Sequence, residues 1–201
     1  MVDNWTTKLS IQWIKKLIST YNYEIKSVFE LQDSDFDIND LIILSWWSYL
    51  ATNPIFDDLK KFIRKYKSAK IIWICLWYQI LWLAHDIDNQ YINLIKMELE
   101  LDGIYSDIYY RNKNNIYQNI KCHRLHKRII QVIKPWLFDI LWFSKYGHDI
   151  IKYKIYPHIW FSFHPHVYTE KTDWKYIFEE IIRLLSAKND RQSSSQNISL
   201  I

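Results

Sequence analysis

The chain has 201 residues, which suits a single domain, and its 26 basic and 22 acidic residues give a net charge of +4 at neutral pH. This small excess is unlike the concentrated basic surface of a nucleic-acid-binding protein, so nucleic acid is not expected as a partner. Glycine occurs only twice, at Gly103 and Gly147, and phosphate-binding loops need several glycines close together. The composition therefore excludes a Rossmann dinucleotide site and a P-loop.

The cysteines and the apolar runs are informative about the cellular location of the protein. The two cysteines, Cys75 and Cys122, lie far apart and lack a zinc-type spacing, which favours reduced, buried thiols in a cytoplasmic protein. The first ten residues lack the basic and apolar regions of a secretory signal. The apolar runs 41–51 and 71–84 are too short to cross a bilayer, so no transmembrane segment is expected. Peripheral membrane or protein contact through exposed aromatic residues stays open.

The first 69 residues are predicted to form a helical N-terminal extension. Amphipathic spacing predicts helices over residues 7–18 and 56–66, and an apolar run predicts a buried helix over 41–51. The acidic segment 32–40 is turn-like, and its last residues can cap the helix that follows.

Residues 70–187 are predicted to form an α/β domain, and the polar, Ser-rich residues 188–201 a disordered tail. Strands are expected over 71–76, 80–84, 104–110 and 159–163, and helices over 89–102, 120–133, 135–146 and 174–186. A single buried helix over 71–84 is an alternative. Alternation of strands and helices predicts a mostly parallel sheet flanked by helices.

The segment 121–128 is the most basic part of the chain. At helical spacing, Cys122, Leu125 and Ile129 share one side, which leaves the basic side chains on the other. They form either the solvated face of an amphipathic helix or a phosphate-binding patch, and the solvated face is the simpler interpretation.

The strongest candidate for chemistry is His85-Asp86-Ile87-Asp88, at the end of the longest apolar run. In a strand that continues through them, Asp86 and Asp88 point to the same side. Two such carboxylates could share a divalent cation, or one could act as an acid or a base. The alternative for Asp88 is that it caps the next helix.

A second candidate is His164-Pro165-His166, which follows the apolar strand expected over 159–163. Imidazoles at a strand end could bind a metal or carry protons, although a histidine is more often structural. The segment Gly147-His148-Asp149-Ile150 is by itself a helix stop followed by polar residues.

Taken together, these segments resemble the polysaccharide deacetylase (NodB-homology) family over residues 79–185. The resemblance is carried by a strand ending in His-Asp-hydrophobic-Asp (83–89), followed by a helix and a Gly-Ile-x-Ser strand ending in an aromatic residue and Arg (103–111). Residues 147–150 resemble the family's Gly-His-Glu-Ile segment, and residues 163–166 resemble its late His-Pro segment.

This resemblance implies a partial or distorted (β/α) barrel that hydrolyses acetyl groups on a sugar polymer, with carbohydrate as the partner. It implies that Asp86 is the catalytic base and His164 the acid on the leaving group. Asp88 and His166 would hold a divalent metal, zinc or similar, that activates water.

The sequence departs from the family at the remaining metal ligands. Tyr153, between Lys152 and Lys154, stands where the first of two metal-binding histidines is needed, and the chain has no His-x-x-x-His. The short stretch between Ile150 and Ile159 leaves no room for the middle strands of a barrel. The domain is therefore expected to be truncated or degenerate, and both an active and an inactive protein stay open.

Two further functions stay open beside the deacetylase. A non-catalytic module could bind glycan through exposed aromatic rings, for which the candidates are Trp46, Trp47, Trp160 and Trp174. A helix-rich interaction protein could instead use its aromatic residues as a core or a partner interface.

Overall fold

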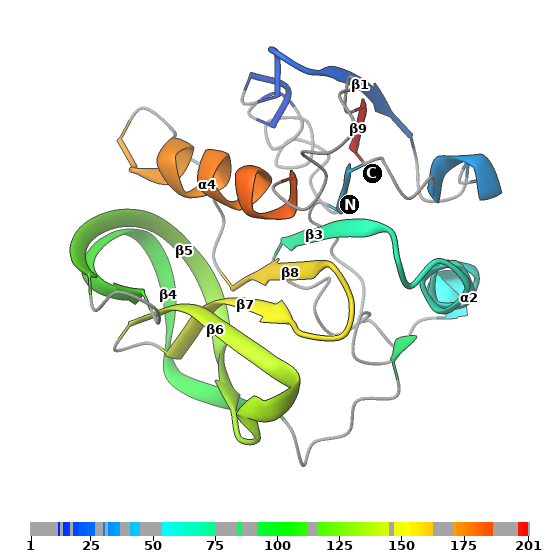
Figure 1. Cartoon of the computed structure of the whole chain (residues 1–201). Helices are drawn as coiled ribbons and strands as arrows, with labels where there is room; N and C mark the ends of the chain where they lie inside the picture. The colour runs from blue at the N-terminus through cyan, green and yellow to red at the C-terminus, as the bar shows by residue number, and fades with distance from the viewer. Residues whose placement is uncertain are drawn as a thin grey trace, which may run out of the picture.

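The structure is a computed structural model that describes part of the chain as an α/β fold (Figure 1). The described residues are 12, 14–16, 18–26, 30, 32–36, 41–44, 54–74, 84–85, 92–111, 116–144, 147–162, 171–186 and 197–200. The strands are β1 (Asn22–Ile25), β2 (Leu41–Leu44), β3 (Lys70–Ile74), β4 (Ile92–Arg111), β5 (Ile116–Val132), β6 (Phe138–Ser144), β7 (Gly147–Tyr153), β8 (His158–Phe161) and β9 (Asn197–Leu200). The helices are α2 (Asp57–Lys65) and α4 (Trp174–Ser186), with 3-10 turns at η2 (Asp33–Phe36), η3 (Pro54–Phe56) and η4 (Pro135–Leu137).

The nine strands of the described residues form one sheet in the order β1-β9-β2-β3-β8-β7-β6-β4-β5. Five of them, from β1 to β8 in this order, run parallel to one another, and the pairs from β8 to β5 are antiparallel. The sheet has two free edges, so it is open. The α/β class predicted from the sequence is confirmed, and the predicted barrel-like closure is wrong.

The central parallel strands are short and buried on both faces. Every residue of β2, β3 and β8 is buried, and most of them are Ile, Leu, Trp or Phe. Such continuous apolar runs are typical of a parallel sheet with a helix layer on each side. The strands that carry these runs therefore form the centre of the molecule.

The antiparallel part is dominated by a long hairpin. β4 and β5 pair from Ile92↔Val132 to Arg111↔Ile116, with a register shift between Lys96 and Leu101. The hairpin curves around one edge of the molecule, shown in green in Figure 1. β6 and β7 connect it to β8.

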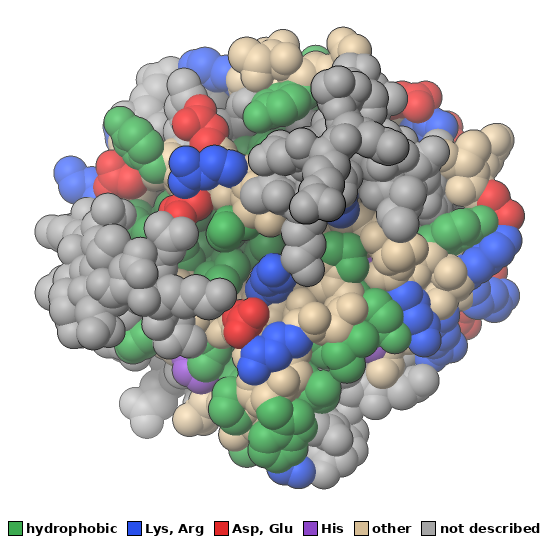
Figure 2. All heavy atoms as spheres, in the orientation of Figure 1, with side chains coloured by type: hydrophobic (Ala, Val, Ile, Leu, Met, Phe, Trp, Pro, Cys, Tyr) green, Lys and Arg blue, Asp and Glu red, His purple; other side chains and the backbone are tan. Residues whose placement is uncertain are grey.

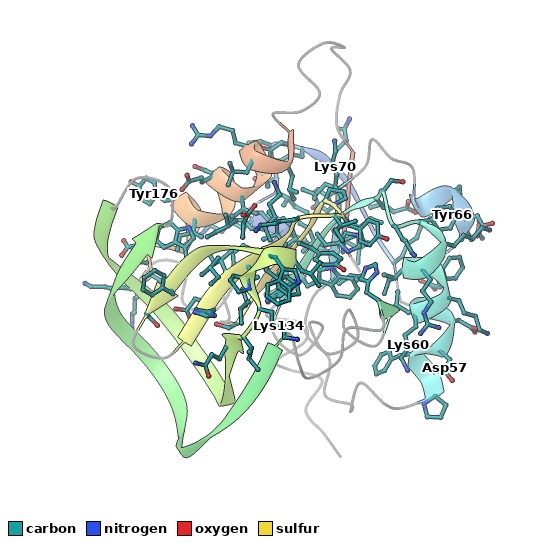
Figure 3. All side chains as sticks on the ribbon, turned by 60° about the horizontal axis from the view of Figure 1, so that its bottom comes forward. Asp57, Lys60, Tyr66, Lys70, Lys134 and Tyr176 are labelled. Atoms are coloured by element: carbon teal, nitrogen blue, oxygen red, sulfur yellow. The ribbon has the colours of Figure 1, made fainter. Side chains whose placement is uncertain are left out.

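Two hydrophobic clusters lie on opposite faces of the sheet, because successive residues of a strand point to opposite sides. In β3, Ile71 and Trp73 belong to the cluster on the α2 side, and Ile72 and Ile74 belong to the cluster on the α4 side. Helix α2 contributes Leu59 and Ile63 to the first cluster, and α4 contributes Ile177, Phe178, Ile181, Ile182 and Leu185 to the second. Figure 3 shows how the chain passes from Asp57 and Lys60 on α2 through Tyr66 to Lys70 at the start of β3.

Several predicted elements match the structure. The helix expected over 174–186 is α4, and α2 lies within the helix expected over 56–66. The strands expected over 71–76 and 159–163 correspond to β3 and β8. These elements have either a clear helical face or an uninterrupted apolar run.

Other predicted elements are wrong. The helices expected over 89–102, 120–133 and 135–146 are largely the strands β4, β5 and β6, and the first part of the helix expected over 41–51 is β2. Ala84, expected at the end of a strand, is helical. In each long strand the apolar spacing also fits a helix, and pairing with a distant partner decides the outcome.

Both ends of the chain contribute strands to the sheet. β1 and β2 come from residues 1–69, which were expected to form a helical extension, and β9 comes from residues 188–201, which were expected to form a disordered tail. β9 pairs with β1 on one side and with β2 on the other, so its backbone gains hydrogen-bond partners that the local sequence of 197–200 cannot reveal. No helix in the described part of the chain is long and apolar enough to cross a membrane.

Candidate functional site

The carboxyl ends of β3 and β8 lie side by side at the centre of the sheet. The two strands are parallel neighbours, and their last residues, Ile74 and Phe161, are register partners. In open α/β sheets, ligands bind outside the carboxyl ends of the strands. We therefore begin the search for a site at this edge.

Two residues with catalytic chemistry follow these strand ends in the sequence. Cys75 is the next residue after Ile74, and His164 is the third residue after Phe161. Cys75 and His164 themselves lie outside the described residues, so the structure places the strand ends from which they continue. A thiol and an imidazole that start from paired strand ends form a candidate for nucleophilic catalysis.

A buried polar pair holds the chain just after β8. The Ser162 hydroxyl donates a hydrogen bond to Asp149 Oδ1 at 2.9 Å, and the Ser162 backbone N–H donates to the Asp149 carbonyl at 2.8 Å. Asp149, on β7, is 1% exposed, and Ser162 is buried too. Two bonds between the same residues fix the backbone two residues before His164.

The start of β7 is fixed next to this pair. Gly147 has a φ of 116°, a conformation that costs glycine little and other residues more. His148 Nδ1 accepts a 2.8 Å hydrogen bond from the Val132 backbone N–H, a bond that requires the unprotonated nitrogen. Burial lowers the pKa of His148, and the nearby Asp149 carboxylate opposes this effect.

A second group of titratable residues lies near the amino ends of the same two strands. His85 Nε2 and His158 Nδ1 are 3.2 Å apart, so one imidazole donates a hydrogen bond to the other. The His85 ring also stacks on Tyr156, with ring centroids 4.9 Å apart. His158 is the first residue of β8 and is fully buried.

The environment of His158 disfavours its charged form. Burial is the main reason why its pKa lies well below 6.5, and the neighbouring His85 lowers this pKa further. Backbone groups of Lys67 and Ala69 offset part of the effect. His85 therefore packs at the amino end of β8. The residues that lead to His164 follow the opposite, carboxyl end of the same strand.

The structure does not describe the four residues predicted for a deacetylase site, but it places some of the other residues that the sequence analysis singled out. Asp86, Asp88, His164 and His166 lie outside the described residues, as do Trp46 and Trp47. Tyr153, which stands at the position of a metal-binding histidine, is a core residue whose ring packs 5.3 Å from that of Phe138. Trp160, a candidate for glycan stacking, is fully buried. Within the described ranges, no group of three or more His, Cys, Asp or Glu side chains is placed to hold a metal ion.

The basic segment also differs from its prediction. Residues 121–128 lie within β5, so they do not form the wet face of a helix. On the face drawn in Figure 2, the basic and acidic side chains of the described residues are interspersed. The electrostatic character of this face is therefore mixed.

Sequence reasoning does not reveal that the strands preceding Cys75 and His164 are neighbours. Each follows an apolar strand that was predicted correctly, and a thiol directly after a buried strand is a usable signal for a nucleophile. Cys75 was instead interpreted as a reduced, buried thiol, because nothing local to it shows that β3 and β8 are neighbours.

No protein-family model matches the sequence, and no curated protein matches it. Solved structures do resemble it in fold. One is described as a GMP synthase subunit from Thermoplasma acidophilum, with a TM-score of 0.67, 17% identity, and coverage of 96% of this chain and 94% of that one. Another is a glutamine amidotransferase from Methylobacillus flagellatus, with a TM-score of 0.51, 13% identity, and coverage of 85% and 75%.

These likenesses overturn the resemblance to polysaccharide deacetylases. The chain shares its open α/β fold with these two solved structures, which match 96% and 85% of it. The carbohydrate deacetylase function and the carbohydrate partner are therefore wrong, and these likenesses support neither of the two alternative functions. The local His-Asp-hydrophobic-Asp motif was misleading because four residues constrain a fold far less than the order and direction of its strands.

Proposed function

We propose that this protein is a glutamine amidotransferase-like enzyme that releases ammonia from the side-chain amide of glutamine, with Cys75 as nucleophile and His164 as its acid–base partner. The observation that carries the proposal is the register of the parallel neighbours β3 and β8, in which Ile74 pairs with Phe161. Cys75 is the first residue after one of these strand ends, and His164 is the third residue after the other. The named activity of a solved structure with this fold supports the same reaction.

The proposed reaction is acyl transfer through a thioester. The imidazole of His164 takes the proton of the Cys75 thiol, and the thiolate attacks the amide carbon of glutamine. The tetrahedral intermediate collapses as its C–N bond breaks, and the imidazolium gives its proton to the nitrogen, which leaves as ammonia. Water then hydrolyses the thioester with the same imidazole as base, so glutamate leaves and the thiol is restored.

Described residues beside the two strand ends support the backbone that leads to the proposed nucleophile and its partner. The two hydrogen bonds between Ser162 and Asp149 fix the backbone that leads to His164. On the other strand, Trp73 is fully buried on the α2 side of the sheet. Both supports belong to the rigid centre of the fold, and a site on rigid elements holds its geometry better than one on loops.

The sequence around Cys75 departs from the usual nucleophile turn. A nucleophile at a strand-to-helix turn commonly has glycine two residues before it and two residues after it. Here these positions hold Trp73 and Trp77. The indole of Trp73 is fully buried. The bulky side chain at this position therefore lies in the hydrophobic core.

The comparisons also bear on partners and location. The T. acidophilum protein is named as part of a synthase. We therefore propose that this chain delivers ammonia to a synthase partner, in the cytoplasm, where the thiols of Cys75 and Cys122 stay reduced. The proposed thiol chemistry uses no metal or cofactor.

The proposal is tested by measuring glutamate and ammonia release from L-glutamine. Cys75→Ser and His164→Ala should each lower the rate by at least a hundredfold, because each removes one member of the acid–base and nucleophile pair. Cys122→Ser is the matched control and should keep the rate of the unchanged protein. Release that survives in Cys75→Ser would contradict the assignment.

A further inference from the structure

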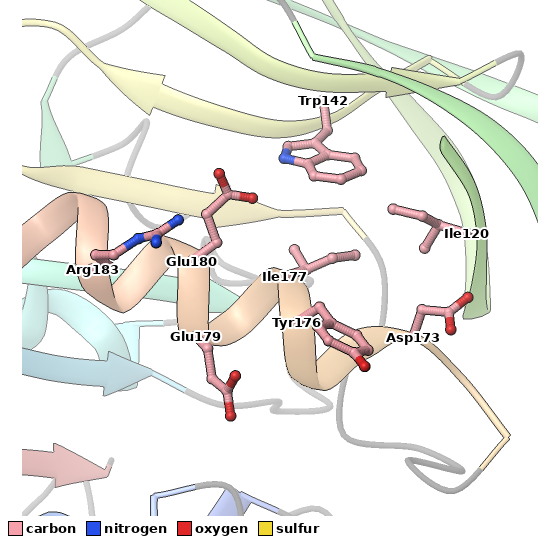
Figure 4. A pocket seen from close by; sticks show the side chains of 8 residues that line it. All are labelled: Ile120, Trp142, Asp173, Tyr176, Ile177, Glu179, Glu180 and Arg183. Atoms are coloured by element: carbon pink, nitrogen blue, oxygen red, sulfur yellow. The ribbon is translucent and has the colours of Figure 1, made fainter. Parts of the chain in front are cut away.

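A cavity of about 680 Å³ lies between α4 and the strands β5 and β6. It is lined by Ile120, Trp142, Asp173, Tyr176, Ile177, Glu179, Glu180 and Arg183. Figure 4 shows Trp142 and Ile120 on the strand side, facing Ile177 on the helix. The volume lies in the range of small-molecule sites in proteins, roughly 300–1,000 Å³.

The inner wall of the cavity is apolar and aromatic. Ile120, Trp142 and Ile177 are each at most 5% exposed, so their side chains are held by the core. All three belong to the α4-side cluster. The indole of Trp142 and the two isoleucines thus give the cavity an apolar inner wall of the kind that aromatic rings pack against.

The outer part of the lining is acidic. Among the described residues of the lining, the carboxylates of Asp173, Glu179 and Glu180 outnumber the guanidinium of Arg183, which gives this part of the wall an excess of negative charge. A negatively lined cavity favours cations and hydrogen-bond donors and disfavours phosphates and carboxylates.

Asp173 is held in place by the backbone of Lys121 on β5. Its Oδ2 accepts a 2.8 Å hydrogen bond from the Lys121 backbone N–H, and its own N–H donates to the Lys121 carbonyl at 3.0 Å. This reciprocal pair ties the beginning of α4 to β5. The carboxylate is thus oriented before a ligand arrives, which lowers the entropy lost on binding.

We propose that this cavity is a binding site for a small planar aromatic cation, or for a heteroaromatic ring that carries amino groups. The ring packs on Trp142, Ile120 and Ile177, and its positive or N–H edge faces the carboxylates of the outer wall. The site consists of side chains that the amide chemistry at Cys75 does not use, so it stands independently of the proposed function.

Isothermal titration calorimetry with benzamidine and benzoate tests the proposal, because the two probes have nearly the same shape and opposite charge. Benzamidine should bind at least tenfold more tightly than benzoate. Glu180→Gln and Glu179→Gln should each weaken benzamidine binding several-fold. Asp58→Asn is the matched control, since it removes a carboxylate on the outer surface of α2, and it should leave binding unchanged.

Two results would overturn the proposal. One is benzamidine binding that is absent at millimolar concentration or no tighter than benzoate binding. The other is benzamidine binding that Glu179→Gln leaves at the strength of the Asp58→Asn control. Glu179 is exposed, so its substitution is expected to leave the fold intact and the test decisive even where Glu180→Gln fails to fold.

Discussion

The parallel and antiparallel halves of the sheet are built from different kinds of strand. In the parallel half, β2, β3 and β8 have four or five residues each, all of them buried. In the antiparallel half, β4 and β5 have 20 and 17 residues, and β6 contains both buried and partly buried positions. The short buried strands end at the proposed site, and the long strands extend away from it.

This difference gives the two halves of the sheet separate roles. A strand that is covered on both faces cannot shift its register without disturbing two cores at once. The ends of β3 and β8 are therefore fixed, which is what a nucleophile and its base require. In the antiparallel half, β6 and β7 include partly buried positions, and β5 and β6 supply one wall of the cavity beside α4.

The largest expected effect comes from truncating a side chain in the parallel half. Ile72→Ala removes three carbons from a residue that is fully buried in β3. It should lower the free energy of unfolding by about 2–5 kcal/mol, the usual range for such a cavity. Ile140→Ala, at a partly buried position of β6, should cost only about 1 kcal/mol. Urea denaturation measures both, and equal losses would remove the contrast between the halves.

A smaller loss is expected at the link between the halves. Ser162→Ala removes the hydroxyl that donates to Asp149 and leaves a buried carboxylate oxygen without that bond. The expected cost is about 1–3 kcal/mol of unfolding free energy. Ser19→Ala is the control, because the Ser19 hydroxyl bonds the Lys16 carbonyl at an exposed position. A loss at Ser162 no larger than that at Ser19 would show that the pair does not anchor the end of β8.

Acidic pH should weaken the fold through its buried histidines. The pKa of His158 is well below 6.5 in the folded protein, so below pH 6.5 the unfolded chain binds more protons than the folded one. Stability is then complete above pH 6.5 and decreases as the pH falls, by up to about 1.4 kcal/mol per pH unit for His158. His148, whose pKa is also lowered, adds to the same trend.

Urea denaturation between pH 7.5 and pH 5 measures this dependence. His158→Gln should flatten the slope, because the substituted side chain cannot titrate. An unchanged slope in this variant would mean that His158 takes up its proton as readily in the folded protein as in the unfolded chain.

The smallest effect is expected at the exposed ion pairs of α2. Lys61 Nζ lies 2.8 Å from Asp58 Oδ1, and the two side chains are 72% and 82% exposed. Hydrogen bonding to Asp58 raises the pKa of Lys61, yet solvent and salt screen such a pair. Lys61→Ala should leave the unfolding midpoint within experimental error, and a clear loss would show that surface pairs contribute more here than their exposure indicates.

The sequence predicted the central strands β3 and β8 and the last helix, but it predicted β2, β5 and β6 as helices. The last helix was predicted at Trp174–Ser186 because its apolar residues recur on one helical face. β3 and β8 were predicted from their apolar runs. β5 was predicted as a helix because Cys122, Leu125 and Ile129 fit helical spacing, and only its pairing with β4, which is not a local property, favours the strand.

Only one of the two residues of the proposed site was singled out from the sequence. His164 was singled out because it follows an apolar strand, although it was given a role on a sugar leaving group. Cys75 follows the other strand and was interpreted as structural. The register of Ile74 with Phe161 relates the two, and it depends on contacts between residues more than 80 positions apart, which no local pattern contains.

The proposed function depends most on Cys75 being the nucleophile. The most direct measurement is alkylation by 6-diazo-5-oxo-L-norleucine, a glutamine analogue whose diazoketone reacts with a thiolate, followed by peptide mass spectrometry. Cys122 in the same chain is the internal control. We predict one adduct, on Cys75, whose formation L-glutamine slows and D-glutamine does not. Equal labelling of Cys75 and Cys122, or labelling of Cys75 that L-glutamine does not slow, would contradict this role.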